Sequence, residues 1–286
     1  SKIVLPGQAG AILDSSDVLL NPVRARGWPT RPVEDRRQRL GAWQWGNGTY
    51  TFRDLDQDGR LIRWEHRNGS SIARNDLTWD DANRITMITD PNQPGVTGTF
   101  GYDALDRLEL AQIGNPVTTT QQFGYDAVGN RANLTVNSAL TNYSYGSTSN
   151  QLLALSGASS RSYTHDGAGN PTQVNSRVHT YNMANRLVRI MEGASTVATY
   201  KVNGLGQRIS KTVGTTTTRF VYDDQGRLLG EYDSAGKIIQ ETVWLEDLPI
   251  ATLRPTGATG TPTPVNVYYV HADHLGSPRA VTRPSD

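Results

Sequence analysis

A seven-residue pattern recurs along most of the chain and constrains its fold more than any other feature. Each copy has an aromatic residue, Asp or Asn, two variable residues, then Gly, Asn or Asp, a basic residue, and Leu or Ile. The best copies begin at Trp79, Tyr102, Tyr181, Tyr222 and Tyr232. Weaker copies begin at Tyr125, Tyr145, His165 and Val202, and an elongated copy runs from Phe52 to Leu61. Between residues 79 and 222 the copies start 16 to 23 residues apart, which indicates a repeat architecture.

Turn chemistry explains the spacing within each copy. Asp at the first turn position can accept hydrogen bonds from backbone amides, and Gly, Asn or Asp at the fourth tolerates the left-handed conformation. If this fourth residue closes a three-residue hairpin loop, Tyr102 lies opposite Leu108 and Asp103 lies opposite Arg107. Each such cross-strand pair contributes roughly 0.2–1 kcal/mol. Because an isolated hairpin is marginal in water, we expect neighbouring repeats to join into one long sheet.

The same spacing around the turn assigns structural roles to the residues of the other copies. It pairs Trp79 with Ile85, Asp80 with Arg84, Tyr222 with Leu228, Asp223 with Arg227, Tyr232 with Ile238 and Asp233 with Lys237. The corresponding positions of two further copies are held by Tyr125 and Asp126, and by Tyr181 and Arg186. One face of each hairpin should therefore carry an aromatic and aliphatic pair, and the other face a charged pair.

Composition agrees with an all-β chain and excludes several function classes. The 286 residues include 28 Gly and 14 Pro, and the chain is rich in the turn and strand formers Thr, Asn and Tyr. The formal net charge is +1, and no apolar stretch approaches the roughly 18–20 residues that span a bilayer. Zero cysteines exclude disulfides, thiolate metal sites and cysteine nucleophiles. Common nucleotide-loop, serine-elbow and zinc-helix motifs do not occur, so we predict neither a cofactor nor catalytic residues.

Near its end the chain carries a second motif, Tyr-Tyr-Val-His-Ala-Asp-His-Leu-Gly-Ser-Pro-Arg-Ala-Val-Thr at 268–282. We call it the core motif, and its candidate residues are Tyr269, His271, Asp273, His274, Gly276, Pro278 and Arg279. Together, the repeat and the core motif resemble the Rhs, or tyrosine-aspartate (YD) repeat, proteins. This family includes bacterial polymorphic toxins, cargo-carrying subunits of insecticidal toxin complexes, and animal teneurins. The resemblance covers about residues 50–283, and the core motif looks like the start of the Rhs-associated core.

The resemblance implies an all-β array of YD hairpins that forms a long curled sheet, a shell or part of one. Such a noncatalytic shell encloses or presents a C-terminal toxin or effector polypeptide, and its parent is secreted or lies at the cell surface. The family's Asp-Pro-x-Gly cleavage motif does not occur here, so cleavage and toxin activity are not carried over. Two alternatives remain: a carbohydrate- or partner-binding surface module with exposed Tyr and Trp, and an enzyme assembled across repeats through Asp273 or His274.

The repeat also predicts the domain organisation. Residues 1–48 form a non-repeat cap or plug, 49–254 the YD-repeat sheet, 255–267 a flexible loop rich in Gly, Pro and Thr, and 268–286 the start of the core. The first segment mixes Arg with Trp, as nucleic-acid sites do, but the small net charge favours a cap over nucleic-acid binding. A sheet edge left without a cap would favour self-association.

Two groups of residues suggest metal chemistry. His271, Asp273 and His274 are potential ligands, but strand alternation places His274 on the opposite face, and the resemblance gives them a structural role. Asp54, Asp56, Asp58, Gly59 and Glu65 match positions 1, 3, 5, 6 and 12 of an EF-hand calcium loop. Because the flanking residues are β-prone, we favour a repeat hairpin there and keep calcium as the alternative.

Overall fold

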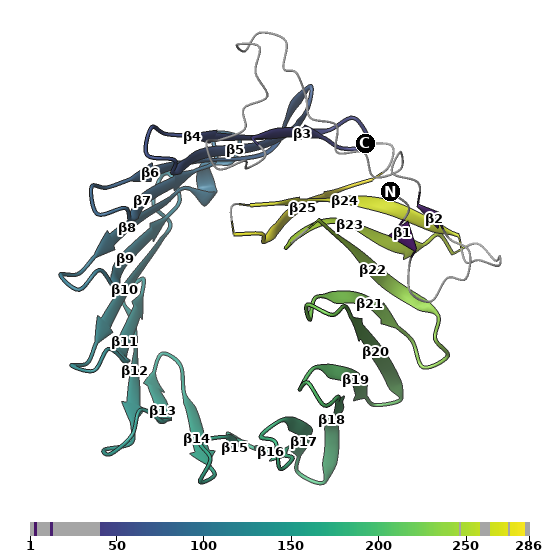
Figure 1. The fold of residues 1–286 in the computed structure, drawn as a ribbon. Helices are drawn as coiled ribbons and strands as arrows, with labels where there is room; N and C mark the ends of the chain where they lie inside the picture. The colour runs from purple at the N-terminus through teal and green to yellow at the C-terminus, as the bar shows by residue number, and fades with distance from the viewer. Residues whose placement is uncertain are drawn as a thin grey trace. The chain divides into compact units, whose positions relative to one another are not determined.

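The computed structural model of the protein describes residues 3–4, 12–13, 41–245, 247–257, 264–273 and 275–283. Within these residues the regular structure is antiparallel β-strands and one short 3-10 turn, η1 (Pro94–Val96). The predicted all-β class with an array of hairpins is therefore confirmed (Figure 1). Of the helices in the described ranges, none is long and apolar enough to cross a bilayer.

The chain divides into two compact units, which we describe separately. Unit 1 comprises Ser1–Thr97, Tyr222–Tyr232 and Gly236–Asp286, and unit 2 comprises Gly98–Val221 and Asp233–Ala235.

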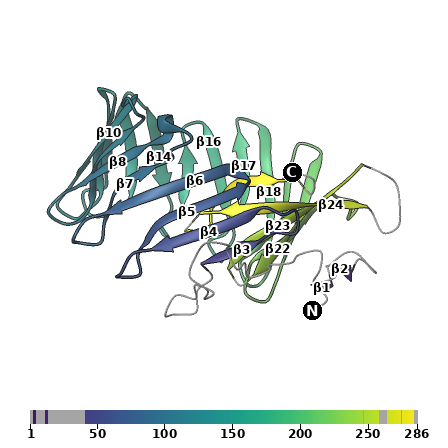
Figure 2. The same ribbon diagram turned by 90° about the horizontal axis from the view of Figure 1, so that it is seen from above.

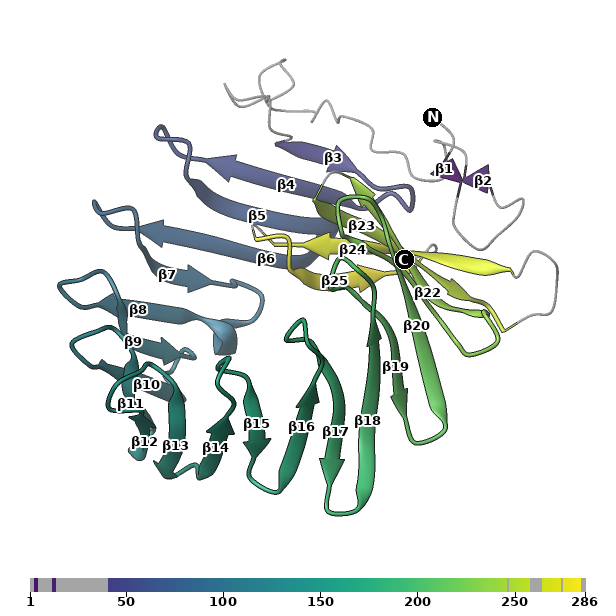
Figure 3. The same ribbon diagram turned by 60° about the horizontal axis from the view of Figure 1, so that its bottom comes forward.

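Unit 2 is a ladder in which each strand pairs with the next strand along the chain (Figure 3). Its strands are β8 (Gly98–Tyr102), β9 (Leu108–Ile113), β10 (Thr119–Tyr125), β11 (Arg131–Val136), β12 (Ala139–Tyr145), β13 (Leu152–Gly157), β14 (Arg161–His165), β15 (Pro171–Val174), β16 (Arg177–Tyr181), β17 (Leu187–Glu192), β18 (Ser195–Val202), β19 (Arg208–Val213) and β20 (Thr216–Tyr222). Most strand residues here are partly buried or exposed, and only a few, such as Ala111, Thr141 and Ala198, are buried.

Unit 1 contains an early and a late group of strands. The early group is β3 (Ala42–Gln44), β4 (Tyr50–Leu55), β5 (Leu61–Asn68), β6 (Ser70–Trp79) and β7 (Ile85–Thr89). The late group is β21 (Leu228–Tyr232), β22 (Ile238–Leu245), β23 (Leu248–Pro255), β24 (Val265–Ala272) and β25 (Pro278–Thr282). A separate pair joins β1 (Ile3–Val4) and β2 (Ile12–Leu13).

The main hydrophobic core lies in unit 1, where β3 and the late strands meet (Figure 1; Figure 2). Trp43 and Trp45 pack there with Ala251, Leu253 and Tyr269, all buried. Strand β23 reads as a nearly continuous apolar run because both of its faces are covered, and its residues from 249 to 253 are all buried. Burying a large apolar side chain stabilises a fold by roughly 1.5–3 kcal/mol, so this cluster is the main anchor of unit 1.

The predicted division into cap, repeats, loop and core stays a prediction, and sheet structure extends across two of its boundaries. Strand β3 precedes residue 49 and pairs with β4, while β24 begins at Val265, inside the segment 255–267. Within this segment Pro255 pairs with Val265, and the Thr256 N–H donates to the Pro264 carbonyl at 3.0 Å. Residues 258–263 and most of 1–40 lie outside the described residues.

Candidate functional site

Hairpin turns in both units share one backbone geometry. The residue at the Asp position donates its N–H to the carbonyl four residues later, and its own carbonyl accepts from the N–H three residues later. The fourth turn residue has a φ between +58° and +90°, which is the predicted left-handed conformation. The geometry occurs at Trp45, Asp56, Asp80, Asp103, Asp126, Asp166, Asn182, Asn203, Asp223 and Asp273.

The turn at Asp103 shows why the repeat requires this residue. Asp103 Oδ1 accepts hydrogen bonds from the N–H groups of Leu105 and Arg107 at 2.9 and 3.0 Å, and Oδ2 accepts from Arg107 Nε at 2.7 Å. The hydrogen bond from the Arg107 backbone is the largest of the effects that lower the pKa of the Asp103 carboxyl. Tyr102 pairs with Leu108, so the predicted register is confirmed.

The other copies differ in how fully they keep this arrangement. Trp79 pairs with Ile85 and Tyr232 with Ile238, as predicted. Ion pairs join Asp80 to Arg84 at 2.7 Å and Asp223 to Arg227 at 2.6 Å. In two copies Asn130 and Asn170 hold the basic position and donate side-chain hydrogen bonds of 2.9 Å to Asp126 and Asp166. The pairs Tyr222 with Leu228 and Asp233 with Lys237 stay predictions.

Arg186 follows a turn that has Asn in place of Asp. Asn182 still accepts hydrogen bonds from the N–H groups of Ala184 and Arg186, each at 3.0 Å. The Arg186 guanidinium lies over the next repeat, where a β-carbon on Gly206 would be 2.7 Å from Arg186 Nε. Gly206 has a φ of +80°, so the backbone favours glycine there, whereas the end of the flexible Arg186 side chain could shift to admit a β-carbon.

The prediction of an elongated copy that begins at Phe52 is wrong. Leu55 pairs with Leu61, and Asp56 begins the turn, so this is a copy of ordinary length with Leu at the aromatic position. Phe52 instead pairs with Glu65, further along the same two strands. The aromatic requirement hid this copy from the sequence analysis.

The calcium-like pattern lies in this same hairpin. Strands β4 and β5 flank the loop, whereas an EF-hand loop lies between helices. Asp56 accepts hydrogen bonds from the Asp58 and Arg60 N–H groups and from Arg60 Nε, and Asp54 lies 3.4 Å from Arg63. Glu65 is on β5 and pairs with Arg74 of β6. Among the described residues, no three His, Asp or Glu side chains are grouped to hold a metal ion.

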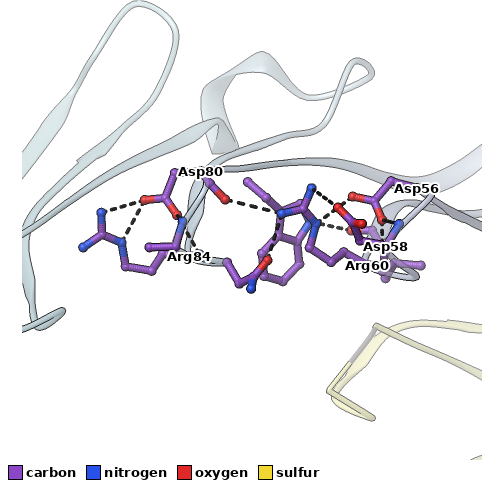
Figure 4. Close-up of polar contacts among 9 residues, drawn as sticks. Asp56, Asp58, Arg60, Asp80 and Arg84 are labelled. Carbon is purple, nitrogen blue, oxygen red and sulfur yellow. Dashed lines mark hydrogen bonds and ion pairs between the residues drawn. The ribbon is translucent and has the colours of Figure 1, made fainter.

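Side chains at the basic position also contact the next repeat (Figure 4). Arg60 Nη1 lies 3.4 Å from the Asp80 carbonyl and donates to Asn83 Oδ1 at 2.9 Å, one turn further along unit 1. In unit 2 the shorter Asn130 and Asn170 reach the following turns, donating to Asn150 and Asn185 at 3.1 and 3.0 Å. Arg107 lies 4.4 Å from the ring centre of Tyr125. The basic position therefore joins successive hairpins.

The repeat aromatics have a polar role that the sequence analysis missed. Trp79 Nε1 donates to the Leu61 carbonyl at 2.8 Å, and the Tyr125 hydroxyl donates to the Leu108 carbonyl at 2.7 Å. Equivalent bonds join Tyr145 to Arg131 at 3.0 Å and Tyr181 to Pro171 at 3.2 Å.

These acceptors share one position in the repeat. Each acceptor carbonyl belongs to the last residue of the preceding copy, which pairs across the hairpin with the first residue of that copy. The strand register shifts at this pair, which marks a bulge. A bulge interrupts the ladder, and a carbonyl there needs another donor. The signal was in the sequence, because the aromatic copies have Tyr or Trp, which carry a donor, and not Phe.

The core motif is itself a hairpin with the repeat geometry. Asp273 Oδ1 accepts from the N–H groups of Leu275 and Ser277 at 2.9 and 3.0 Å, and Gly276 has a φ of +75°. Ala272 pairs with Pro278 at the position where copies such as Trp79 and Tyr102 pair an aromatic with Ile or Leu. Arg279 is exposed, and His274 lies outside the described residues.

Strand β24 of the core motif packs against the early strands of unit 1. The rings of His271 and His66, a β5 residue, have centroids 4.8 Å apart, and both side chains are fully buried. The Trp45 ring lies 5.3 Å from His271 and 6.1 Å from Tyr269, and the Trp64 ring lies 5.1 Å from His66. We call these residues the histidine cluster: His66, His271, Trp45, Trp64 and Tyr269. Sequence reasoning found His271 but missed His66.

Two threonines orient the imidazoles. Thr51 Oγ1 accepts a hydrogen bond from Trp45 Nε1 at 2.8 Å and lies 2.7 Å from His66 Nδ1. Thr282 Oγ1 accepts from Asn47 Nδ2 at 2.9 Å and lies 2.9 Å from His271 Nε2. Each threonine hydroxyl accepts one hydrogen bond and can donate its own hydrogen to a ring nitrogen, which requires that nitrogen to be unprotonated, as in a neutral imidazole.

Burial makes this neutral state the stable one. It lowers the pKa of His66 to about 3, with the neighbouring His271 and Arg53 acting in the same direction and the Ala272 carbonyl opposing them. It also lowers the pKa of His271 to about 4. A second buried pair lies in the late strands, where the Tyr232 hydroxyl donates to Glu241 Oε1. Burial raises the pKa of Glu241 and that of Tyr232.

A polar contact outside the histidine cluster also links the ends of unit 1. Asn47 lies in the turn after β3, and its Nδ2 donates to Thr282 Oγ1 and to the Arg283 carbonyl at 2.9 and 3.0 Å. Together with the histidine cluster, this contact anchors β24 and β25 to strands that lie more than 200 residues earlier in the chain. The candidate site is thus a junction between the first repeats and the core motif.

Comparison with one solved structure supports the same fold. A chain in the Photorhabdus luminescens Tc holotoxin pore is similar over 87% of this chain, with a TM-score of 0.64 and 16% identity. A chain in the TcdB2-TccC3-Cdc42 crystal structure also matches 87% of this chain, with a TM-score of 0.44 and 15% identity. The protein spans 14% and 17% of those two chains.

Comparison of sequences identifies the family. No curated protein sequence matches the chain. The Teneurin YD-shell family matches residues 96–285, which include the repeats of unit 2, the late strands and the core motif. Because this match covers more than half of its length, the chain belongs to the Teneurin YD-shell family.

Proposed function

We propose that the protein is a shell segment that encloses or presents a toxin or effector polypeptide attached beyond the core motif. The observation that carries the proposal is the junction between the core motif and the first repeats. His271 and Tyr269 of β24 are buried against Trp45 and His66, and Asn47 holds Thr282 of β25. A polypeptide continuing from β25 would leave beside Thr282, which is buried and held by Asn47, as a cargo tether requires.

The solved relatives give this proposal a context. They come from a Tc holotoxin pore and from a TcdB2-TccC3 complex, so we propose that the parent of this segment is an extracellular or secreted protein that associates with toxin components. The repeats supply a rigid wall in this view, because aromatic donors and side chains at the basic position join several successive hairpins.

The test uses the full chain with an unstructured, neutral reporter polypeptide added after Asp286. A matched fusion carries the same reporter before Ser1. If the shell encloses its C-terminal extension, a protease cleaves the C-terminal reporter at least about tenfold more slowly, equivalent to about 1.4 kcal/mol of protection. If it presents the extension instead, amide exchange in the repeat strands slows only in the C-terminal fusion. Equal cleavage together with unchanged exchange would contradict both forms of the proposal.

A further inference from the structure

Charge is distributed unevenly along unit 2. Residues 161–221 contain eight Lys and Arg but only two acidic residues, Asp166 and Glu192, a formal net charge of +6. Residues 98–160 contain two basic and four acidic residues, a formal net charge of −2. The asymmetry is part of the repeat chemistry, because Asn182 and Asn203 hold turn positions where other copies have Asp.

Both acidic residues of the basic half already have partners. Asp166 accepts hydrogen bonds from the N–H groups of Ala168 and Asn170 and from the Asn170 side chain. Glu192 forms an ion pair with Arg177 at 3.3 Å and accepts a hydrogen bond from Ser176. Neither carboxylate is paired with Arg189, Lys201 or Arg219.

Strands β17 to β20 are neighbours in the sheet (Figure 3), and their register gathers these three cations on one face. Arg189 pairs with Thr199, and Lys201 follows two residues later on the same side of β18. Lys201 pairs with Ser210, which pairs in turn with Arg219. All three cations are exposed, and within the described part of the chain no ion pair joins them to an acid. We call them the cationic face.

We propose that the cationic face binds an extended, acidic polypeptide segment. Lys201 and Arg219 lie two strands apart, roughly 10 Å across the sheet, and Arg189 lies one strand from Lys201 and two residues along. Side chains on one side of an extended peptide recur about every 6.6–6.8 Å, so alternating carboxylates can meet this set of cations. Hydroxyls of Thr199 and Ser210 lie between the cations and can donate to the same peptide.

The opposite face of the same strands explains why a polypeptide fits better than a single-stranded nucleic acid. Tyr200 and Phe220 hold the alternate positions of β18 and β20, and Arg208 lies over both rings at 5.8 and 4.9 Å. The cationic face therefore does not have these aromatics as stacking platforms, which nonspecific nucleic-acid sites use alongside positive charge. This inference rests on the proposed function, because the proposed function is what identifies the bound segment as cargo.

Binding is measured by the fluorescence anisotropy of a labelled peptide of alternating Glu and Ser, with a Gln and Ser peptide as its neutral counterpart. The test variant combines Arg189→Gln, Lys201→Gln and Arg219→Gln. The matched variant makes the same change in charge at Arg161, Lys211 and Lys237; Lys211 pairs with Tyr200 and so lies on the opposite face. We expect the acidic peptide to bind, salt to weaken binding, and the test variant to lose about tenfold in affinity while the matched variant loses less than about threefold.

Three results would overturn the inference: no binding of the acidic peptide, equal losses in the two variants, or tighter binding of a poly-dT strand with the same loss in the test variant. The proposed function is judged separately, because its reporter is neutral. An unprotected reporter beside intact acidic-peptide binding contradicts the shell proposal alone. A protected reporter without acidic-peptide binding contradicts the cationic face alone.

Discussion

Acid should weaken the junction in unit 1 through its two buried histidines. The native pKa values are about 3 for His66 and about 4 for His271. An unfolded histidine titrates near 6.5, so between these values the unfolded chain binds more protons than the native chain, and stability falls as pH falls. Integrated from about pH 8 to about pH 5, each imidazole costs about 2 kcal/mol, or about 4 kcal/mol for the pair.

The histidine contribution has to be separated from that of other groups. Burial raises the pKa of Glu241, so this residue works in the opposite direction: its contribution is complete at acid pH and is lost as the pH rises. Turn carboxylates such as Asp80, where the Arg84 backbone hydrogen bond is the largest effect lowering the pKa, lose stability only at more acid pH. A difference between wild type and a histidine variant at each pH cancels both contributions.

The variant is His66→Gln with His271→Gln, because glutamine can still hydrogen-bond to Thr51 and Thr282 but does not titrate. Urea unfolding at about pH 5 and about pH 8, with amide exchange of β24 as a local readout, gives the difference. We expect wild type to lose about 4 kcal/mol more than the variant on acidification. His179→Gln, a change in β16 of unit 2, should retain the wild-type dependence. Equal pH dependence in wild type and the double variant would refute the reasoning.

Other predictions test the turns and the bonds between repeats. Tyr125→Phe should cost about 1–3 kcal/mol, because it leaves the Leu108 carbonyl without its donor, whereas Tyr143→Phe, for which no hydroxyl hydrogen bond is seen in the described structure, should cost much less by urea unfolding. Asp103→Ala should lower the urea midpoint of unfolding, and Asp103→Asn should lower it by less, since asparagine keeps the turn acceptor in other copies. Asn47→Ala should speed amide exchange in β25 while leaving exchange in unit 2 unchanged.

Each of these predictions has a clear opposite result. Equal losses for the two tyrosine variants would show that ring packing, and not the hydroxyl, sets the cost. An asparagine at 103 as damaging as alanine would show that the ion pair to Arg107 matters more than the turn. Uniformly faster exchange after the Asn47 change would indicate global destabilisation of the chain.

Local features of the fold could be predicted from the sequence, because they depend on residues close together in the chain. The spacing of Tyr102, Asp103 and Asp106 carries its own turn chemistry, so register and left-handed conformation follow without tertiary information. The same method missed the copy at Leu55, where the turn is intact but the aromatic is replaced. It also read the core motif as a possible ligand set, although Asp273 uses its carboxylate to close another repeat turn.

The junction could not be predicted in this way. His66 lies on a strand that reads as an ordinary repeat, and its partner His271 is about 200 residues away. The residues near His66 in the sequence do not indicate that both faces of β23 and β24 are covered. Burial, however, is what lowers the pKa of both imidazoles. Pairings between distant strands depend on the whole array, which one sequence pattern does not encode.

The bonds from aromatic donors to bulge carbonyls give the array a direction. Where a copy keeps its Tyr or Trp, the hairpin supplies a donor to the hairpin before it, as Tyr125 does for Leu108 and Tyr145 for Arg131. Removing or duplicating one whole hairpin brings an equivalent donor to an equivalent acceptor, so the seam keeps its chemistry. Partial deletions break it. Evolution can therefore change the length of such a sheet by whole hairpins while keeping the hydrogen bond between neighbouring hairpins.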